Sequence, residues 1–101
     1  MVLYNLTAIV EEEFHDEWMT WMKEIFIPSV INTGLFKDHH VLRVLDSPNP
    51  GVTYCFQFIA AGHQEYQKFR DRHEPALLND YYNKFENKAV SFSTLMEYCD
   101  K

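Results

Sequence analysis

The sequence has few of the residues that build the common catalytic and nucleotide-binding motifs. It contains three glycines among 101 residues, and it has no P-loop, no GxGxxG and no GxSxG sequence. The two cysteines, Cys55 and Cys99, show no CxxC spacing, and the five histidines form no HExxH or HxH pattern. The sequence therefore excludes classical nucleotide and serine-hydrolase chemistry. It predicts no metal site, no cofactor and two reduced thiols.

Positive charge is also scarce. Nine Lys and Arg stand against fifteen Asp and Glu, which gives a net charge of −6, and no basic stripe occurs along the chain. A protein that binds nucleic acid or an anionic membrane needs such a stripe. No apolar run approaches the roughly 20 residues of a membrane span, and the N-terminus lacks the positive region of a signal peptide. We therefore expect a cytoplasmic protein with no nucleic-acid partner and no membrane partner.

Aromatic residues, in contrast, are abundant. Eight Phe, six Tyr and two Trp make up 16% of the chain. The length predicts one domain over residues 1–101. So many large flat side chains in one small domain indicate a surface beyond a single core, either a dimer interface or an aromatic-lined cleft.

The spacing of apolar residues alternates between the period of a strand and that of a helix. Period two predicts strands over 2–10, 37–46, 52–61 and 89–98. Helical spacing predicts helices over 12–33, with a kink at Pro28, over 63–73, and from Pro75 to 85. The turn over 47–51 makes the second and third strands an antiparallel hairpin.

This order, β-α-β-β-α-β, predicts an α+β ferredoxin-like fold with a four-stranded antiparallel sheet. In that fold the third and fourth strands are not neighbours, so Cys55 and Cys99 stay apart. The helices cover one face of the sheet. The uncovered face is expected to carry apolar side chains drawn from Leu3, Ile9, Val41, Leu45 and Ile59. An apolar patch of that size predicts a homodimer of the dimeric α/β-barrel type.

Several short segments resemble a known family of bacterial proteins, domain of unknown function 4286, found largely in Bacteroidetes. The segments are Leu3-Tyr4-Asn5-Leu6-Thr7, Trp18-x-x-Trp21-Met22, Ile27-Pro28 with Thr33-Gly34-Leu35-Phe36, Gly51-Val52-Thr53-Tyr54, His73-x-Pro75-Ala76-Leu77 and Phe92-x-Thr94-Leu95.

The resemblance implies a ferredoxin-like fold within the dimeric α/β-barrel group, and no established activity. That group includes cofactor-free monooxygenases, haem-degrading monooxygenases and lactone isomerases, so membership says little about function. A histidine before Ile-Pro is common in the family, and Phe26 takes its place here. A mechanism that depends on a histidine at that place in the first helix is therefore unsupported. His73-Glu74-Pro75, in contrast, keeps the His-x-Pro pattern of the second half of the chain.

The candidate ligand-binding residues fall into two groups. His39 and Arg43 alternate onto one strand face and are expected beside Asn5, Thr7, Gln57, Ser91 and Ser93. These polar groups either bind a ligand inside the dimer barrel or form a hydrogen-bonded interface without one. Trp18 is expected to share a helix face with His15 and Met22, which is either a ligand-facing patch or part of the core.

Two histidines are candidate catalytic residues. His73 and Glu74 are either a general acid–base pair or the break between two helical segments. His39 is the second candidate, in the wall of the barrel.

Three functions fit these residues. The favoured hypothesis is an uncharacterised dimeric barrel protein that holds a small, partly apolar molecule between sheet and helices. The second is an enzyme similar to cofactor-independent monooxygenases or isomerases, acting on an aromatic substrate positioned by His73, Asn5 and His39. The third is a protein–protein interaction module without catalysis.

Overall fold

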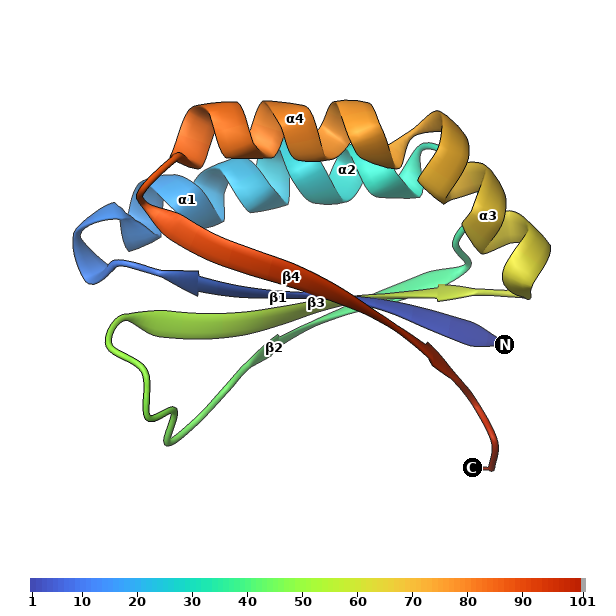
Figure 1. Ribbon diagram of the computed structural model, residues 1–101, viewed down its shortest axis with the longest axis horizontal. Coiled ribbons are helices and arrows are strands. Elements are labelled where there is room, and N and C mark those ends of the chain that lie inside the picture. The colour runs from blue at the N-terminus through green and yellow to red at the C-terminus, as the bar shows by residue number, and fades with distance from the viewer. Residues whose placement is uncertain (101) are drawn as a thin grey trace.

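The computed structural model describes residues 1–100, and its centre is a four-stranded antiparallel sheet. The strands are β1 (Val2–Val10), β2 (Asp38–Arg43), β3 (Val52–Ala60) and β4 (Ala89–Glu97), in the order β2-β3-β1-β4. All helices lie on one face of this sheet (Figure 1). The predicted ferredoxin-like α+β fold is therefore confirmed. Cys55, on β3, and Cys99, beyond the end of β4, are both free thiols, and β3 and β4 do not pair.

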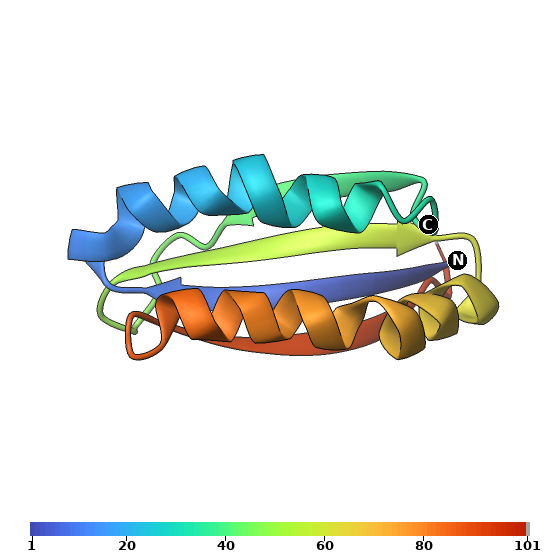
Figure 2. The same cartoon turned by 90° about the horizontal axis from the view of Figure 1, so that it is seen from above.

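Two helical runs cross the sheet side by side (Figure 2). The first contains a 3-10 turn (Glu12–Phe14), α1 (His15–Trp21), a π-helical turn (Met22–Phe26) and α2 (Ile27–Ile31), and it covers the β2–β3 side. The second contains α3 (His63–Arg72) and α4 (Glu74–Phe85); α4 covers the β1–β4 side. Within residues 1–100, no helix combines the length and the apolar character needed to cross a membrane.

The π-helical turn explains how the first run tolerates Pro28. Proline has no N–H, and its ring clashes with the carbonyl four residues earlier in a regular α-helix. The Ile27 N–H instead bonds the Met22 carbonyl, five residues back, which widens the helix there. The irregularity expected at Pro28 therefore lies in the turn before it, and the helix continues to Ile31.

The same wide turn keeps one face of the run against the sheet. Buried residues recur every four positions: Trp18, Met22, Phe26 and Val30, each no more than 1% exposed. On a regular α-helix such a repeat drifts around the axis by about 40° at each step. The extra residue in the π-helical turn removes much of that drift.

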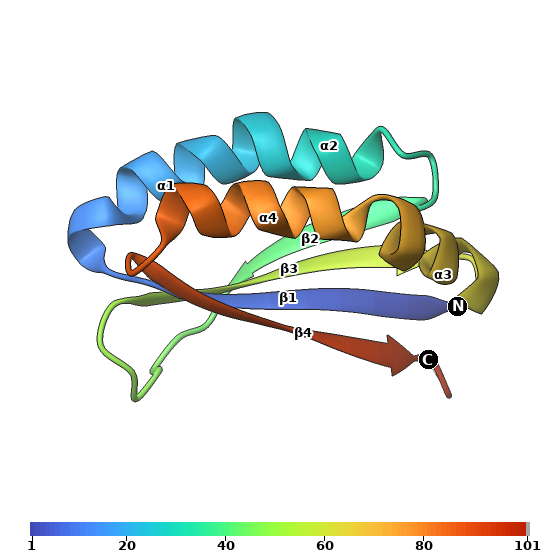
Figure 3. The same cartoon turned by 45° about the horizontal axis from the view of Figure 1, so that its top comes forward.

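The core lies between the helices and the inner face of the sheet. Alternate residues of the two central strands face the helices and are buried: Val2, Tyr4, Leu6, Ala8 and Val10 on β1, and Val52, Tyr54, Phe56, Phe58 and Ala60 on β3. The opposite face carries no helix. The β2–β3 loop and the C-terminal end both extend away from the helices, on the side of this uncovered face (Figures 1 and 3).

Candidate functional site

Strand register divides the predicted ligand-binding residues between the two faces of the sheet. Asn5 is opposite Gln57, and both point to the uncovered face together with Thr7. His39 is opposite Phe58 and Arg43 is opposite Tyr54, so both lie on the helix side of β2. Ser91 and Ser93, opposite Ala8 and Leu6, also face the helices. The expectation that all seven share one face is therefore wrong, because pairing with β1 and β3 sets the register of the edge strands.

Val41 and Leu45 are also misplaced by the sequence pattern. Val41 is opposite Phe56 and faces the helix side, and Leu45 lies beyond the end of β2. The strand ends early because the next residues enter the turn, where Asp46 takes a positive φ of 58°. Leu3, Ile9 and Ile59 do lie on the uncovered face, as expected.

Trp18 belongs to the core. Its indole N–H donates to the Tyr81 hydroxyl at 3.2 Å, and that hydroxyl shares a hydrogen bond of 2.5 Å with Ser91. Trp18 has no exposed surface. His15, predicted beside it, stacks on Tyr54 at 5.5 Å and hydrogen-bonds the Tyr54 hydroxyl at 2.9 Å. This helix face therefore links α1 to β3 and α4.

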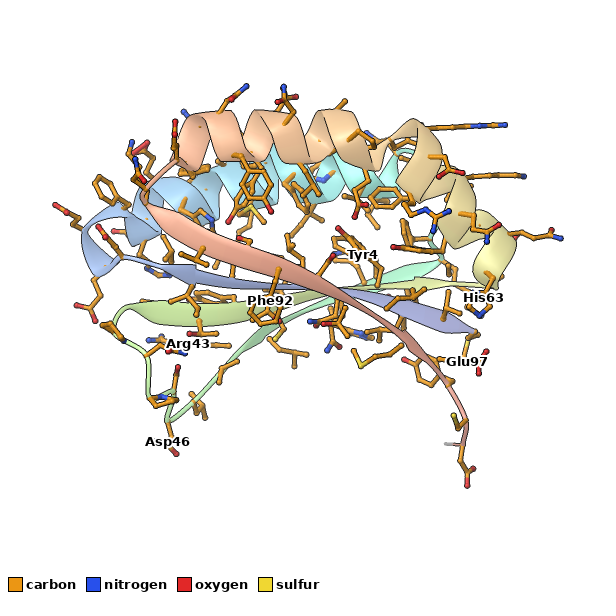
Figure 4. The ribbon with its side chains drawn as sticks, viewed as in Figure 1. Tyr4, Arg43, Asp46, His63, Phe92 and Glu97 are labelled. Atoms are coloured by element: carbon orange, nitrogen blue, oxygen red, sulfur yellow. The ribbon has the colours of Figure 1, made fainter. Side chains whose placement is uncertain are left out.

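Tyr4 lies at the centre of an aromatic cluster on the inner face of the sheet (Figure 4). Its ring is 5.3 Å from that of Phe69 and 5.8 Å from that of Tyr66, both on α3. Phe36 and Phe58 complete the cluster at 6.3 and 6.2 Å. Only 1% of Tyr4 is exposed, so these rings enclose it almost completely.

The polar end of Tyr4 is the unusual feature of this cluster. The Tyr4 hydroxyl and Oε2 of Glu74 are both buried, and although the two side chains are neighbours, neither atom has a hydrogen bond of good geometry among the described residues. Burial raises the pKa of Tyr4 far above its ordinary value, and the adjacent Glu74 carboxyl raises it further through its hydrogen-bonding contact with the phenol and through its charge. The phenol therefore keeps its proton and acts as a donor, and the carboxyl oxygen beside it is an acceptor. We call these two groups the Tyr4–Glu74 site.

Both candidate catalytic histidines flank the same aromatic cluster. His39 stacks on Phe58 at 6.2 Å, and His73 stacks on Phe69 at 6.5 Å. Phe36 lies between those rings, 5.7 Å from Phe58 and 5.0 Å from Phe69. His73 also forms the junction of α3 and α4, where its carbonyl accepts the Leu77 N–H at 3.2 Å. The fold thus brings His39, His73 and Glu74 around one group of rings.

Glu74 and Tyr4 were missed as a pair by sequence reasoning. Tyr4 follows the alternation of a buried strand, which gives no sign that its hydroxyl lacks a partner. The sequence pattern associates Glu74 only with His73, at a helix start where acidic residues are common. A buried tyrosine that requires a hydrogen-bond partner is a signal in principle. Without the fold, that partner could not be named.

A second group of polar residues forms a continuous chain on the uncovered face. Gln57 donates to Asn5 Oδ1 at 3.3 Å, Asn5 donates to Thr7 at 2.9 Å, and the Thr7 hydroxyl contacts Cys55 Sγ at 3.6 Å. Large apolar side chains around it are exposed, among them Val90 (68%), Phe92 (54%), Leu42 (47%) and Met96 (43%). A groove of about 400 Å³ at one end is lined by residues that include Leu3, Gln57 and Met96.

Metal ligation finds no support in the part of the chain that the structure describes. No group of three or more His, Cys, Asp or Glu side chains is placed there to hold an ion. The His40–Asp38 and His63–Glu97 pairs, at 3.7 and 3.4 Å, lie at the surface.

Comparison with known families shows where this chain belongs. The family described as Domain of unknown function (DUF4286) matches residues 1–99. The chain is a member of the DUF4286 family. No curated protein sequence matches this DUF4286 protein.

Solved structures share the fold of this DUF4286 protein at low sequence identity. A dimeric ferredoxin-like protein from an uncultured marine organism is 11% identical, with a TM-score of 0.74 over 100% of this chain and 97% of that one. SnoaB, a cofactor-independent oxygenase from Streptomyces nogalater, is 15% identical, with a TM-score of 0.72 over 99% and 94%. HapK from Hahella chejuensis is 12% identical, with a TM-score of 0.68 over 100% and 95%. At these identities the similarity shows the fold.

Proposed function

We propose that this chain is one ferredoxin-like domain that forms a homodimer and binds a small, partly apolar molecule at the Tyr4–Glu74 site. The observation that carries the binding proposal is the buried phenol and carboxyl oxygen without hydrogen-bond partners among the described residues. A buried polar group left unpaired costs about 1–3 kcal/mol, so a molecule that pairs with both groups gains that energy. The Phe36, Phe58 and Phe69 rings supply an apolar wall.

The ligand reaches this site at the α3–α4 junction. His73 has a φ of −123°, which interrupts the helical path between α3 and α4. Tyr66, on α3 beside Tyr4, is only partly buried. An outward movement of α3, which packs on Tyr4 through Phe69 and Tyr66, would expose the phenol. His73 is then at the entrance, and His39 is across the rings from it.

A thermal-shift screen tests this proposal. A ligand that binds only the folded protein raises its melting temperature once the ligand concentration exceeds the dissociation constant. The panel contains haem, flavins and hydroxylated aromatic compounds. We expect a saturable shift that is lost in Tyr4→Phe and kept in Tyr98→Phe, which removes a hydroxyl from the exposed end of the chain. An equal shift in both variants would place the ligand elsewhere.

A second function, catalysis, is favoured by the unpaired Glu74 oxygen. A general base has to lie within hydrogen-bond reach of the proton that it removes, and this buried acceptor has no hydrogen bond of good geometry among the described residues. For any ligand found in the screen, Glu74→Gln separates the two functions. If the protein is an enzyme of the cofactor-independent oxygenase kind, the variant still binds the ligand but loses oxygen consumption. If it only binds, no oxygen is consumed by either protein.

The homodimer is supported by the apolar side chains on the uncovered face of the sheet. A monomer would leave Val90, Phe92, Leu42 and Met96 in water, and such patches usually mark interfaces. The structural similarity to a dimeric ferredoxin-like protein agrees with this. We expect the assembly to work in a bacterial cytoplasm, without nucleic acid or membrane.

Phe92→Lys tests the interface directly. Sedimentation analysis of this variant should show monomers at concentrations where the natural protein is a dimer, with an unchanged circular-dichroism spectrum. Tyr82→Lys, which places the same charge at an exposed aromatic on α4, should remain a dimer. If the natural protein is a monomer at about 100 µM, the homodimer proposal fails.

A further inference from the structure

Gln57 ends the polar chain on the uncovered face with two of the three hydrogen-bonding groups of its amide unused. A carboxamide offers two N–H donors and one carbonyl acceptor. One N–H of Gln57 bonds Asn5 Oδ1 at 3.3 Å, and within residues 1–100 the amide makes no other hydrogen bond. His40, which lies opposite Gln57 on β2, is paired with Asp38 instead. Gln57 therefore presents one free donor and one free acceptor at its outer edge.

A group with one free donor beside one free acceptor can pair with its own copy across a two-fold axis. In a symmetric dimer a residue on the axis meets its own copy, so whatever it donates it must also accept. Two carboxamides satisfy this by exchanging a pair of N–H···O=C hydrogen bonds. Asn5, only 6% exposed, has its oxygen and one N–H engaged by Gln57 and Thr7, and so holds the Gln57 amide in place.

We propose that Gln57 of one copy pairs with Gln57 of a second copy at the dimer axis, and that the Gln57–Asn5–Thr7–Cys55 chain sets how the two sheets align. This inference rests on the homodimer proposed above. The occupant of the uncovered face is a second copy because the amide is complementary to itself and the same face carries exposed apolar side chains, among them Leu42, Phe92 and Met96. Leu3 and Ile59, each 8% exposed, flank it, and Met96 extends beyond them. A buried polar pair of this kind adds little net affinity, but it disfavours dimers in which the two sheets are aligned differently, because the amides would then be left unpaired.

Paired charges at position 57 test this contact. In Gln57→Glu and in Gln57→Lys, two like charges meet at the axis, and we expect the dimer dissociation constant to rise at least about tenfold in each. Mixing the two variants places opposite charges together. Native mass spectrometry should then show predominantly the mixed dimer. The matched control is Gln67→Glu with Gln67→Lys, at an exposed position on α3, and it should dimerise normally and mix at random.

The outcomes separate the two proposals. A natural protein that is monomeric by sedimentation overturns the homodimer itself. A dimeric natural protein whose position-57 variants dimerise normally overturns the pairing of Gln57 alone. The pairing is also overturned if both variants dissociate but their mixture does not recover.

Cross-linking tests the proximity of the two copies of position 57 without introducing charge. Sheets packed face to face lie about 10 Å apart. In a background with Cys55→Ser and Cys99→Ser, Gln57→Cys should therefore be joined between copies by a short bismaleimide. Thr94→Cys, on the same face but two strands away, should react far less. Equal cross-linking at both positions, or more at position 94, would overturn the placement of the axis.

Discussion

The indole N–H of Trp18 and the hydroxyl of Tyr81 join the two helical runs through a hydrogen bond of 3.2 Å, and neither side chain has exposed surface. The Tyr81 hydroxyl also meets Ser91 on β4 at 2.5 Å. One phenol therefore links α1, α4 and the edge of the sheet. Tyr4 is equally buried, but within residues 1–100 its hydroxyl has only the Glu74 carboxyl nearby and no hydrogen bond of good geometry. The contrast between these two tyrosines yields predictions of opposite sign.

Tyr81→Phe should destabilise the protein by about 1–3 kcal/mol. The change removes two hydrogen bonds and leaves the Trp18 N–H buried without a partner. For a domain of this size, each kcal/mol lowers the melting temperature by roughly 4–8 °C. Calorimetry of the ligand-free protein measures it. An unchanged melting temperature would mean that Trp18 finds another acceptor.

Tyr4→Phe should stabilise the ligand-free protein, by about 1 kcal/mol. The ring contacts are kept, and an unpaired buried hydroxyl is removed. The same calorimetric measurement applies, with Tyr81→Phe as the matched comparison. A loss of stability would show that the Tyr4 hydroxyl already has a partner, such as a bound water, and would weaken the proposed binding site.

Stability should fall as the pH rises above about 10. The pKa values of Tyr4, Tyr66 and Tyr81 are raised in the folded state, mainly by burial, so the folded protein keeps three protons that the unfolded chain releases near the ordinary pKa of tyrosine. Their contribution is complete below pH 10 and decreases above it, by up to about 1.4 kcal/mol per pH unit for each group. Urea unfolding between pH 9 and 11 measures this slope.

The tyrosine variants also test that interpretation. Tyr4→Phe and Tyr81→Phe should each show a shallower decrease of stability above pH 10 than the natural protein. Tyr98→Phe, at an exposed position, should leave the slope unchanged. Equal slopes in all four proteins would assign the alkaline sensitivity to other groups.

Gly51→Ala should cost about 2 kcal/mol or more. Gly51 has a φ of +89°, and a Cβ there would lie 2.5 Å from the Val10 carbonyl oxygen. Gly34 provides a matched control, because its φ is +74° but a Cβ would meet nothing within 4 Å. Gly34→Ala should cost only the backbone term, roughly 1–2 kcal/mol. Denaturant unfolding of both variants separates the steric clash from the backbone strain.

The fold was predictable because the spacing of neighbouring apolar residues indicates each strand and helix. The alternation of Val2 to Val10 lies within one strand, and the four-residue repeat from Trp18 lies within one continuous helical run. The side of the sheet to which His39 and Arg43 point was not predictable in this way. It depends on the pairing of β2 with β3, and a shift of one residue sends each side chain to the other face.

The candidate site was less accessible to sequence reasoning than the fold. His73 and His39 were selected by residue type, and the fold places both beside the same rings. Tyr4 and Glu74 are separated by 70 positions, and their relationship exists only once α4 has packed over β1. A buried group that lacks a hydrogen bond cannot be recognised from the sequence, because the sequence does not show which groups come into contact.

The π-helical turn at Met22–Phe26 has an implication for how this chain can evolve. It makes the first helical run depend on the number of residues it contains as well as on their identity. Deleting one residue there would rotate all that follows by about 100° around the helix axis and would turn Ile27 and Val30 away from the sheet. Some substitutions in this stretch keep the same face of the helix against the sheet, whereas an insertion or a deletion does not. Insertions and deletions among homologues should therefore accumulate in the β2–β3 loop and spare residues 18–30.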